Sequence, residues 1–289
     1  MTRPTRVQDA MHPRAVTISP HDPLPAAVVT MEELGIKRLP VVQEGRVVGI
    51  VTDGEVQRAL PTLTEGLNPW TFTARVGRIR LREIMRAPVH TVTPDTPLRE
   101  ALQTMLDRRV GGLPVVSEAG EALGMLTLTD ILRAQVQAPR LHWGLADQHM
   151  TRSVVTTAPD APAAEAAAKL KVTRLRVLPV VDGGQLVGVL HEKDVAAALD
   201  RAGAAHGPTV MAAQFVLGGV SVRDLMRPPT GYLLEGVPMH DAVRRMLELN
   251  VRGLPIITGE GELLGVLTIS DVIRTLLGQA QPVEVECQQ

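Results

Sequence analysis

One sequence motif recurs four times along this chain of 289 residues, and the spacing within it is nearly constant. Each copy opens with a methionine, and 29 residues later comes the proline of a Leu-Pro pair. A glycine follows nine or ten residues further on, and a carboxylate stands six residues beyond that glycine. Such self-similarity is the signature of a repeat architecture. The four sets are Met11, Pro40, Gly49 and Glu55; Met85, Pro114, Gly124 and Asp130; Met150, Pro179, Gly188 and Asp194; and Met226, Pro255, Gly265 and Asp271.

The spacing defines four repeats, at residues 7–60, 81–135, 146–200 and 222–277. In the second, Leu98, Ala101, Leu102 and Met105 share one face of a predicted helix. The apolar runs LPVV and LGML, which flank a polar turn, predict a hairpin. VHTV fits a leading strand, and DILRA predicts a second helix. We therefore expect an α/β (α+β) fold of four β-α-β-β-α units, which pair because one unit is small for a core of its own.

Composition excludes several classes of function. The formal net charge is −1 and aromatic residues make up 2% of the chain, so we expect no nucleic-acid partner. No run of about 18 apolar residues predicts a membrane span, and the start of the chain does not read as a signal peptide. We therefore expect a cytoplasmic protein. The connecting segments leave no room for a catalytic domain, and the single cysteine, Cys287, forms no metal-binding pattern. We expect no enzyme activity, no metal and no required cofactor.

The motifs inside the repeats resemble those of the CBS-domain family, named after cystathionine β-synthase. The resemblance rests on the D-x-M openings at Met11 and Met226, the Leu-Pro-Val motif before each hairpin and the G-h-h-T-x-x-D pattern after it, and it covers about three quarters of the chain. It implies that two repeats form a compact Bateman module, here residues 1–140 and 141–280. Such modules commonly bind an adenine nucleotide or an adenosyl ligand between their repeats. The two modules then stack on each other or pair with a second chain as a homodimer.

The resemblance also implies ligand-binding residues. Asp130 and Asp271 would hold a ribose, and nearby hydroxyls would bind the sugar or phosphate. Gly124 and Gly265 would let a ligand approach the backbone closely. The same spacings also fit capping boxes at the start of an ordinary helix, and both roles are compatible. The hydroxyls are those of Thr127, Thr129, Thr268 and Ser270.

Repeats 1 and 3 depart from this pattern. Repeat 1 carries Thr52 and the longer Glu55, and repeat 3 carries His191 ahead of Asp194. We treat Thr52, Glu55 and Asp194 as secondary site candidates.

Basic residues before the Leu-Pro pairs would meet phosphate from the neighbouring repeat: Lys37 or Arg38 for the Asp130 site, and Arg174 or Arg176 for the Asp271 site. They could equally be solvated cations at a helix C-terminus. The resulting hypothesis is a nucleotide sensor without catalysis, whose effector is AMP, ADP or ATP, with S-adenosylmethionine and NAD left open. Its output would pass to an unidentified protein partner. The alternative is a ligand-free oligomerisation scaffold.

Overall fold

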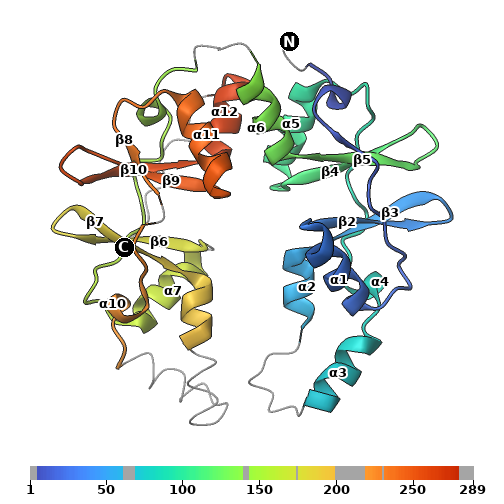
Figure 1. Cartoon of the computed structure of the whole chain (residues 1–289), viewed down its shortest axis with the longest axis horizontal. Coiled ribbons are helices and arrows are strands. Elements are labelled where there is room, and N and C mark those ends of the chain that lie inside the picture. The colour runs from blue at the N-terminus through green and yellow to red at the C-terminus, as the bar shows by residue number, and fades with distance from the viewer. Residues whose placement is uncertain are drawn as a thin grey trace. The chain divides into compact units, whose positions relative to one another are not determined.

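The computed structural model describes residues 5–60, 69–138, 143–173, 175–198, 219–229 and 231–279. The chain forms two compact units, Met1–Pro139 and Arg140–Gln289, each containing two of the repeats. In both units two antiparallel hairpins lie next to each other, and helices cover their opposite outer sides (Figure 1). The fold is therefore the mixed helix-and-strand arrangement that the repeats predict.

The elements of unit 1 follow the predicted order, with a helical turn added at the start of each repeat. Repeat 1 consists of η1 (Val7–Asp9), β1 (His12–Pro13), α1 (Leu24–Leu34), β2 (Arg38–Gln43), β3 (Arg46–Thr52) and α2 (Asp53–Ala59). The linking helix α3 (Pro69–Arg78) comes next. Repeat 2 consists of α4 (Leu81–Ile84), α5 (Leu98–Asp107), β4 (Gly112–Val116), β5 (Ala122–Thr127) and α6 (Leu128–Gln137).

Unit 2 repeats this order. Repeat 3 consists of η3 (Ala146–Gln148), α7 (Ala163–Thr173), β6 (Val177–Asp182), β7 (Gln185–His191) and a helix at 192–198. Repeat 4 consists of α10 (Val222–Leu225), β8 (Leu233–Leu234), α11 (Met239–Leu249), β9 (Gly253–Ile257), β10 (Leu263–Thr268) and α12 (Ile269–Leu277).

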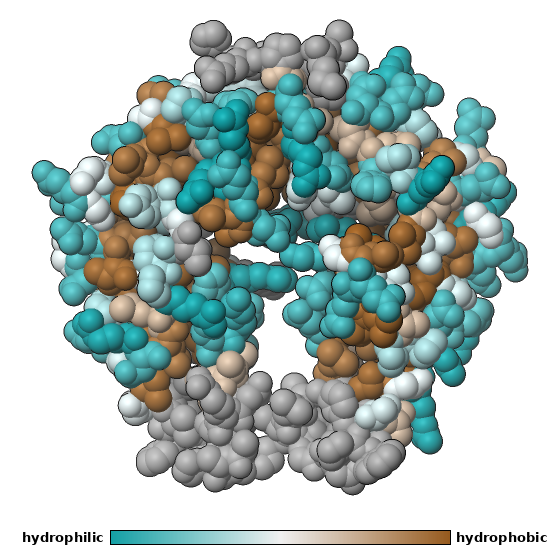
Figure 2. Space-filling view, viewed as in Figure 1, coloured by the Kyte–Doolittle hydropathy of each residue, from teal (hydrophilic) through white to brown (hydrophobic). Residues whose placement is uncertain are grey.

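The helical periodicity of the sequence correctly predicts the buried face of α5. On α5 the buried residues are Leu98, Ala101, Leu102 and Met105, as their shared face predicts. The predicted leading strand is shorter than expected: in repeat 2 it is reduced to a single parallel bridge between Val92 and Val115, and in repeat 4 to the two residues of β8. Each unit keeps its hydrophobic residues mainly between hairpins and helices, and Figure 2 shows the hydrophobic residues visible on one face as several patches bordered by hydrophilic residues.

The first residues of each repeat pack on the other repeat of the same unit. We call residues 5–14, 79–86, 144–151 and 220–227 the opening segments. In unit 1 the Val7 N–H donates to the Thr96 carbonyl at 3.0 Å, and the Leu81 N–H donates to the Asp22 carbonyl at 3.0 Å. Repeat 1 therefore holds the opening segment of repeat 2, and repeat 2 holds that of repeat 1.

Unit 2 makes the same exchange. The Ala146 N–H donates to the Val237 carbonyl at 2.9 Å, and the Val222 N–H donates to the Ala161 carbonyl at 2.9 Å. Each opening segment also inserts one apolar side chain that has no solvent exposure, so part of each repeat's core is supplied by its neighbour. These side chains are Val7, Leu81, Ala146 and Val222.

This exchange explains the repeated methionine and glycine. A methyl group built on Gly265 would lie 2.6 Å from the Met150 sulfur and 2.6 Å from the Thr151 carbonyl oxygen. On Gly124 it would lie 2.5 Å from the His12 carbonyl oxygen. The expectation that these two glycines admit a ligand is therefore wrong, because the opening segment of the other repeat fills the space beside them.

We expect Gly265→Ala to destabilise the protein by roughly 1–3 kcal/mol, because the added methyl group would push backbone and Met150 apart in a packed interface. Denaturant unfolding measures the change. Gly259→Ala is the matched control, since nothing lies within 4 Å of that position, and it should change stability by less than about 0.5 kcal/mol. Equal stabilities of the two variants would contradict the packing role.

Candidate functional site

The second helix of repeats 2 and 4 begins with the predicted threonine and carboxylate pair. In repeat 2 the backbone N–H and the hydroxyl of Thr127 donate to Asp130 Oδ2, at 3.0 and 2.5 Å. The Asp130 N–H donates back to Thr127 Oγ1 at 3.2 Å. Thr268 and Asp271 repeat the arrangement, with 2.8 and 2.7 Å to Asp271 Oδ2. Both pairs are complete capping boxes.

Capping leaves one oxygen of each carboxylate for another partner. Asp130 Oδ1 lies 3.7 Å from Arg133 Nη1, a long contact to a side chain that is 59% exposed. Asp271 Oδ1 accepts a hydrogen bond of 3.1 Å from Arg274 Nη1. The Asp130 side chain is 16% exposed and that of Asp271 is 2% exposed. Asp130 is therefore the more accessible acceptor, whereas a ligand at Asp271 would have to displace Arg274.

The carboxylates of repeats 1 and 3 are bound by arginines from an opening segment. Glu55 Oε1 accepts hydrogen bonds of 2.6 Å from both Arg58 Nη2 and Arg86 Nε, and its Oε2 accepts from the Thr52 backbone N–H at 3.1 Å. Asp194 Oδ1 pairs with Arg227 Nη2. Arg86 and Arg227 are functional candidates that the sequence analysis missed. The sequence offers a signal for both, because each arginine directly follows the methionine that recurs in every repeat.

Glu55 and Asp271 differ in how far neighbouring groups offset the effect of burial on the carboxyl pKa. Burial alone would raise the pKa of Glu55, but the hydrogen bond from Thr52 and the charge of Arg86 outweigh it and lower that pKa. Burial raises the pKa of Asp271, although Thr268 and Arg274 oppose the rise. Glu55 is therefore held as a charged member of an ion-pair cluster, whereas Asp271 carries an uncompensated part of its desolvation penalty.

The stem of Arg38 lies near Gly112 and Thr127 at the end of β5. A methyl group built on Gly112 would lie 3.3 Å from Arg38 Cδ and 3.3 Å from Thr127 Cγ2. Arg38 and Gly112 each begin the first strand of their hairpin, so the two repeats meet at these positions. Because Gly112 has no side chain, there is room for the Arg38 stem near the end of β5.

Unit 2 has no arginine at the corresponding position. Arg38 pairs with Thr52 across its hairpin, and Val177 pairs with His191 in the same register. Val177 therefore stands where unit 1 has Arg38.

The remaining predicted residues are less well placed. Lys37, Arg176, Thr129 and Ser270 are exposed, and no contact described joins them to the two capping carboxylates. Arg174 lies outside the described residues.

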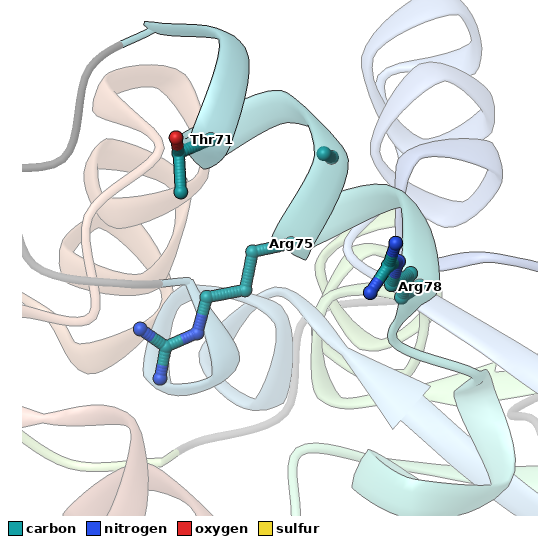
Figure 3. A pocket seen from close by; sticks show the side chains of 4 residues that line it. Thr71, Arg75 and Arg78 are labelled. Carbon is teal, nitrogen blue, oxygen red and sulfur yellow. The ribbon is translucent and has the colours of Figure 1, made fainter.

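A hollow lies along α3, lined by Thr71, Ala74, Arg75 and Arg78, and contains none of the predicted site residues (Figure 3). Within the described ranges, no three histidine, cysteine or carboxylate side chains are grouped closely enough to bind a metal ion. In the same part of the chain, no helix has both the length and the apolar character to cross a membrane.

Comparison with known proteins places the repeats in a family. The model of the CBS domain matches residues 7–62, 81–137, 146–201 and 222–278. An uncharacterized protein of Methanocaldococcus jannaschii is 26% identical over 273 residues, which are 92% of this chain and 96% of that protein. Its crystal structure, described as that of a proposed archaeal homolog of g-AMPK, covers 94% of this chain and 99% of its own with a TM-score of 0.68.

Enzymes of different activities match over a shorter stretch. The inosine-5'-monophosphate dehydrogenase of Korarchaeum cryptofilum is 34% identical over 116 residues, which are 40% of this chain and 21% of the enzyme. The homoserine O-acetyltransferase of Methanosalsum zhilinae is 29% identical over 121 residues, which are 42% of this chain and 24% of the enzyme. The chain therefore spans less than a quarter of either enzyme.

We expect His191 to make stability depend on pH near neutrality. Burial lowers its pKa from 6.5, Lys193 and Arg227 lower it further, and Asp194 partly opposes them. As pH falls through about 6.5, the unfolded chain binds the proton first, so the free energy of unfolding should decrease. His191→Thr installs the residue found at this position in the other repeats and should flatten the decrease between pH 7.5 and 5.5 in denaturant unfolding. An unchanged slope would contradict this assignment.

Proposed function

Because the chain belongs to the CBS-domain family, we propose that it is a regulatory protein without catalysis that binds an adenine nucleotide or another adenosyl ligand. The principal site would lie in unit 1 and would be formed by Asp130 and Thr127 of repeat 2 together with Arg38 of repeat 1. Asp130 would accept hydrogen bonds from ribose hydroxyls, and the guanidinium of Arg38 would meet a phosphate group.

The position of Arg38 is the observation that carries this proposal. Its stem and Thr127 Cγ2 each lie 3.3 Å from the place of a methyl group on Gly112, near the end of β5. A cation and a partly exposed carboxylate, supplied by two different repeats, match the opposite needs of a phosphate and a sugar diol. Guanidinium is well suited to phosphate because its planar fork can donate two hydrogen bonds at once.

The oxygens of Asp130 allow it to cap the helix and bind a ligand together. Oδ2 accepts both the N–H and the hydroxyl of Thr127, whereas among the described residues Oδ1 has only the 3.7 Å contact with Arg133. A ribose hydroxyl can therefore approach Oδ1 without dismantling the cap. We rank the Asp271 site second, because Arg274 already occupies Asp271 Oδ1 and Val177 replaces the arginine.

The shorter matches to enzymes support a role without catalysis. A dehydrogenase and an acetyltransferase perform unrelated reactions, yet each resembles about two fifths of this chain. Each matching segment is therefore a poor candidate for the chemistry of the enzyme that contains it. In this chain, ligand binding would instead change how the modules or two subunits are arranged and so signal to a protein partner, to the extent that the ligand favours one arrangement.

A ligand-free oligomerisation scaffold is the second candidate. The observation that favours it is the completeness of the capping boxes, since Thr127 and Asp130 satisfy each other without any ligand. Under that function the two residues would contribute only to stability.

Thermal unfolding of the full chain with AMP, ADP, ATP, GTP, S-adenosylmethionine and NAD separates the two functions. A ligand at 100 times its dissociation constant stabilises the folded state by about 2.7 kcal/mol, which raises the midpoint. We expect adenine ligands to raise it. Asp130→Ala should weaken binding roughly 10- to 150-fold, through the loss of about 1.5–3 kcal/mol of charge-assisted hydrogen bonding.

The matched control is Glu83→Ala. Glu83 Oε1 accepts the Arg80 backbone N–H at 2.9 Å, so this variant loses a capping carboxylate in the same unit outside the proposed site. It should retain the wild-type affinity. A midpoint that no adenine ligand raises at millimolar concentration, or equal losses of affinity in both variants, would leave the scaffold as the better account.

A further inference from the structure

The residue that follows each repeated methionine pairs through its backbone with the strand of the other repeat that leads to the carboxylate. His12 pairs with Met125, two residues before Thr127, and Arg86 pairs with Ile50, two residues before Thr52. In unit 2 the corresponding pairs are Thr151 with Val266, two residues before Thr268, and Arg227 with Val189, two residues before His191. The backbone register is the same in all four repeats. We call His12, Arg86, Thr151 and Arg227 the crossing residues.

The crossing residue is arginine in one site of each unit. Arg86 Nε lies 2.6 Å from Glu55 Oε1, and Arg227 pairs with Asp194 Oδ1. Both carboxylates are deeply buried, at 6% and 8% side-chain exposure. Glu55 Oε1 corresponds to the oxygen that capping leaves available at Asp130, since Glu55 Oε2 accepts the Thr52 N–H. At Asp194, Oδ2 has no hydrogen-bond partner among the described residues, and Arg227 takes Oδ1. Arg86 and Arg227 therefore occupy the position that a ligand hydroxyl would need.

The other site of each unit lacks such an arginine. The exposed His12 lies on the Asp130 side of unit 1, and its Nδ1 donates to the carbonyl oxygen of Pro13 at 3.0 Å. Thr151, also exposed, stands in register beside the Asp271 site, and its hydroxyl carries no charge. Within each unit, one difference between the two sites is therefore the side chain supplied by the opposite repeat.

We propose that the crossing residue sets which sites accept a ligand, with Arg86 and Arg227 acting as built-in occupants that close the Glu55 and Asp194 sites. This inference rests on the proposed nucleotide site at Asp130 and deepens it. Each unit then has at most one open site, although it carries two copies of the motif. The arginines act as specificity-determining residues in addition to neutralising buried carboxylates.

Installing the arginine at the open site provides the first test. We expect His12→Arg to weaken binding of AMP and ATP at the Asp130 site at least tenfold in isothermal titration of the full chain. Gln8→Arg adds the same charge at an exposed position of the same opening segment and should bind within about twofold of wild type. Wild-type affinity in His12→Arg, with nucleotide still bound through Asp130, would overturn the inference.

Removing the arginine provides the reverse test. Arg86→His combined with Glu55→Asp gives the repeat 1 site the crossing residue and carboxylate of the open repeat 2 site. We expect this folded variant to bind one additional equivalent of AMP per chain. Glu55→Asp alone is the control and should keep the wild-type stoichiometry. An unchanged stoichiometry in the combined variant would limit Arg86 to neutralising its buried carboxylate and overturn its role as an occupant.

A measurement without ligand keeps this inference separate from the proposed function. An arginine that reaches Asp130 should lower the pH midpoint of its carboxyl ¹³C signal by about one unit or more in His12→Arg. Gln8→Arg should leave that midpoint in place. If wild type binds no nucleotide, the proposed function fails, and the midpoint still decides whether the crossing residue controls the carboxylate. An unmoved midpoint in His12→Arg overturns the inference.

Discussion

The exchange of opening segments between paired repeats is the constraint on which each unit depends. Backbone hydrogen bonds such as Val7 to Thr96 and Leu81 to Asp22 join the two repeats in both directions. The exchange requires a residue without a side chain on the receiving strand, and Gly124 and Gly265 meet that need. It also places one repeat's residues at the other repeat's helix start. Packing and candidate binding sites are therefore products of the same crossing.

Four carboxylates at equivalent positions have acquired different environments in this way. Glu55 and Asp194 are buried and paired with arginines from an opening segment, whereas Asp271 depends on Arg274 in its own helix. Asp130 keeps the greatest exposure of the four, and within the part of the chain that the structure describes its Oδ1 has a single long contact, to Arg133. Desolvation is costly for a charge unless a partner is close, so the available partner largely decides whether such a group stays poised for a ligand.

Much of the fold could be predicted from the sequence because local patterns carry it. Helical periodicity located the buried face of α5, and the Thr-x-x-Asp spacing predicted the cap at Asp130. The exchange could not be predicted in the same way, since a repeat shows self-similarity without showing which copy a segment packs against. For that reason Gly124 was misread as an opening for ligand, and Arg86 was overlooked. Lys37 or Arg38 was expected to meet phosphate at the Asp130 site; the stem of Arg38 lies near Gly112 and Thr127, Lys37 is exposed, and the phosphate contact stays a prediction.

The exchange also bears on how such chains can be inherited. A single repeat separated from its neighbour would lose the apolar side chain that fills its core, such as Leu81 in repeat 1, and would expose the surface that received it. Duplication or transfer of one repeat alone would therefore produce a domain with an incomplete hydrophobic core. The smallest portion that can move between genes intact is the pair, and the matches of 116 and 121 residues to two enzymes of different activity are closer in length to a pair than to a single repeat.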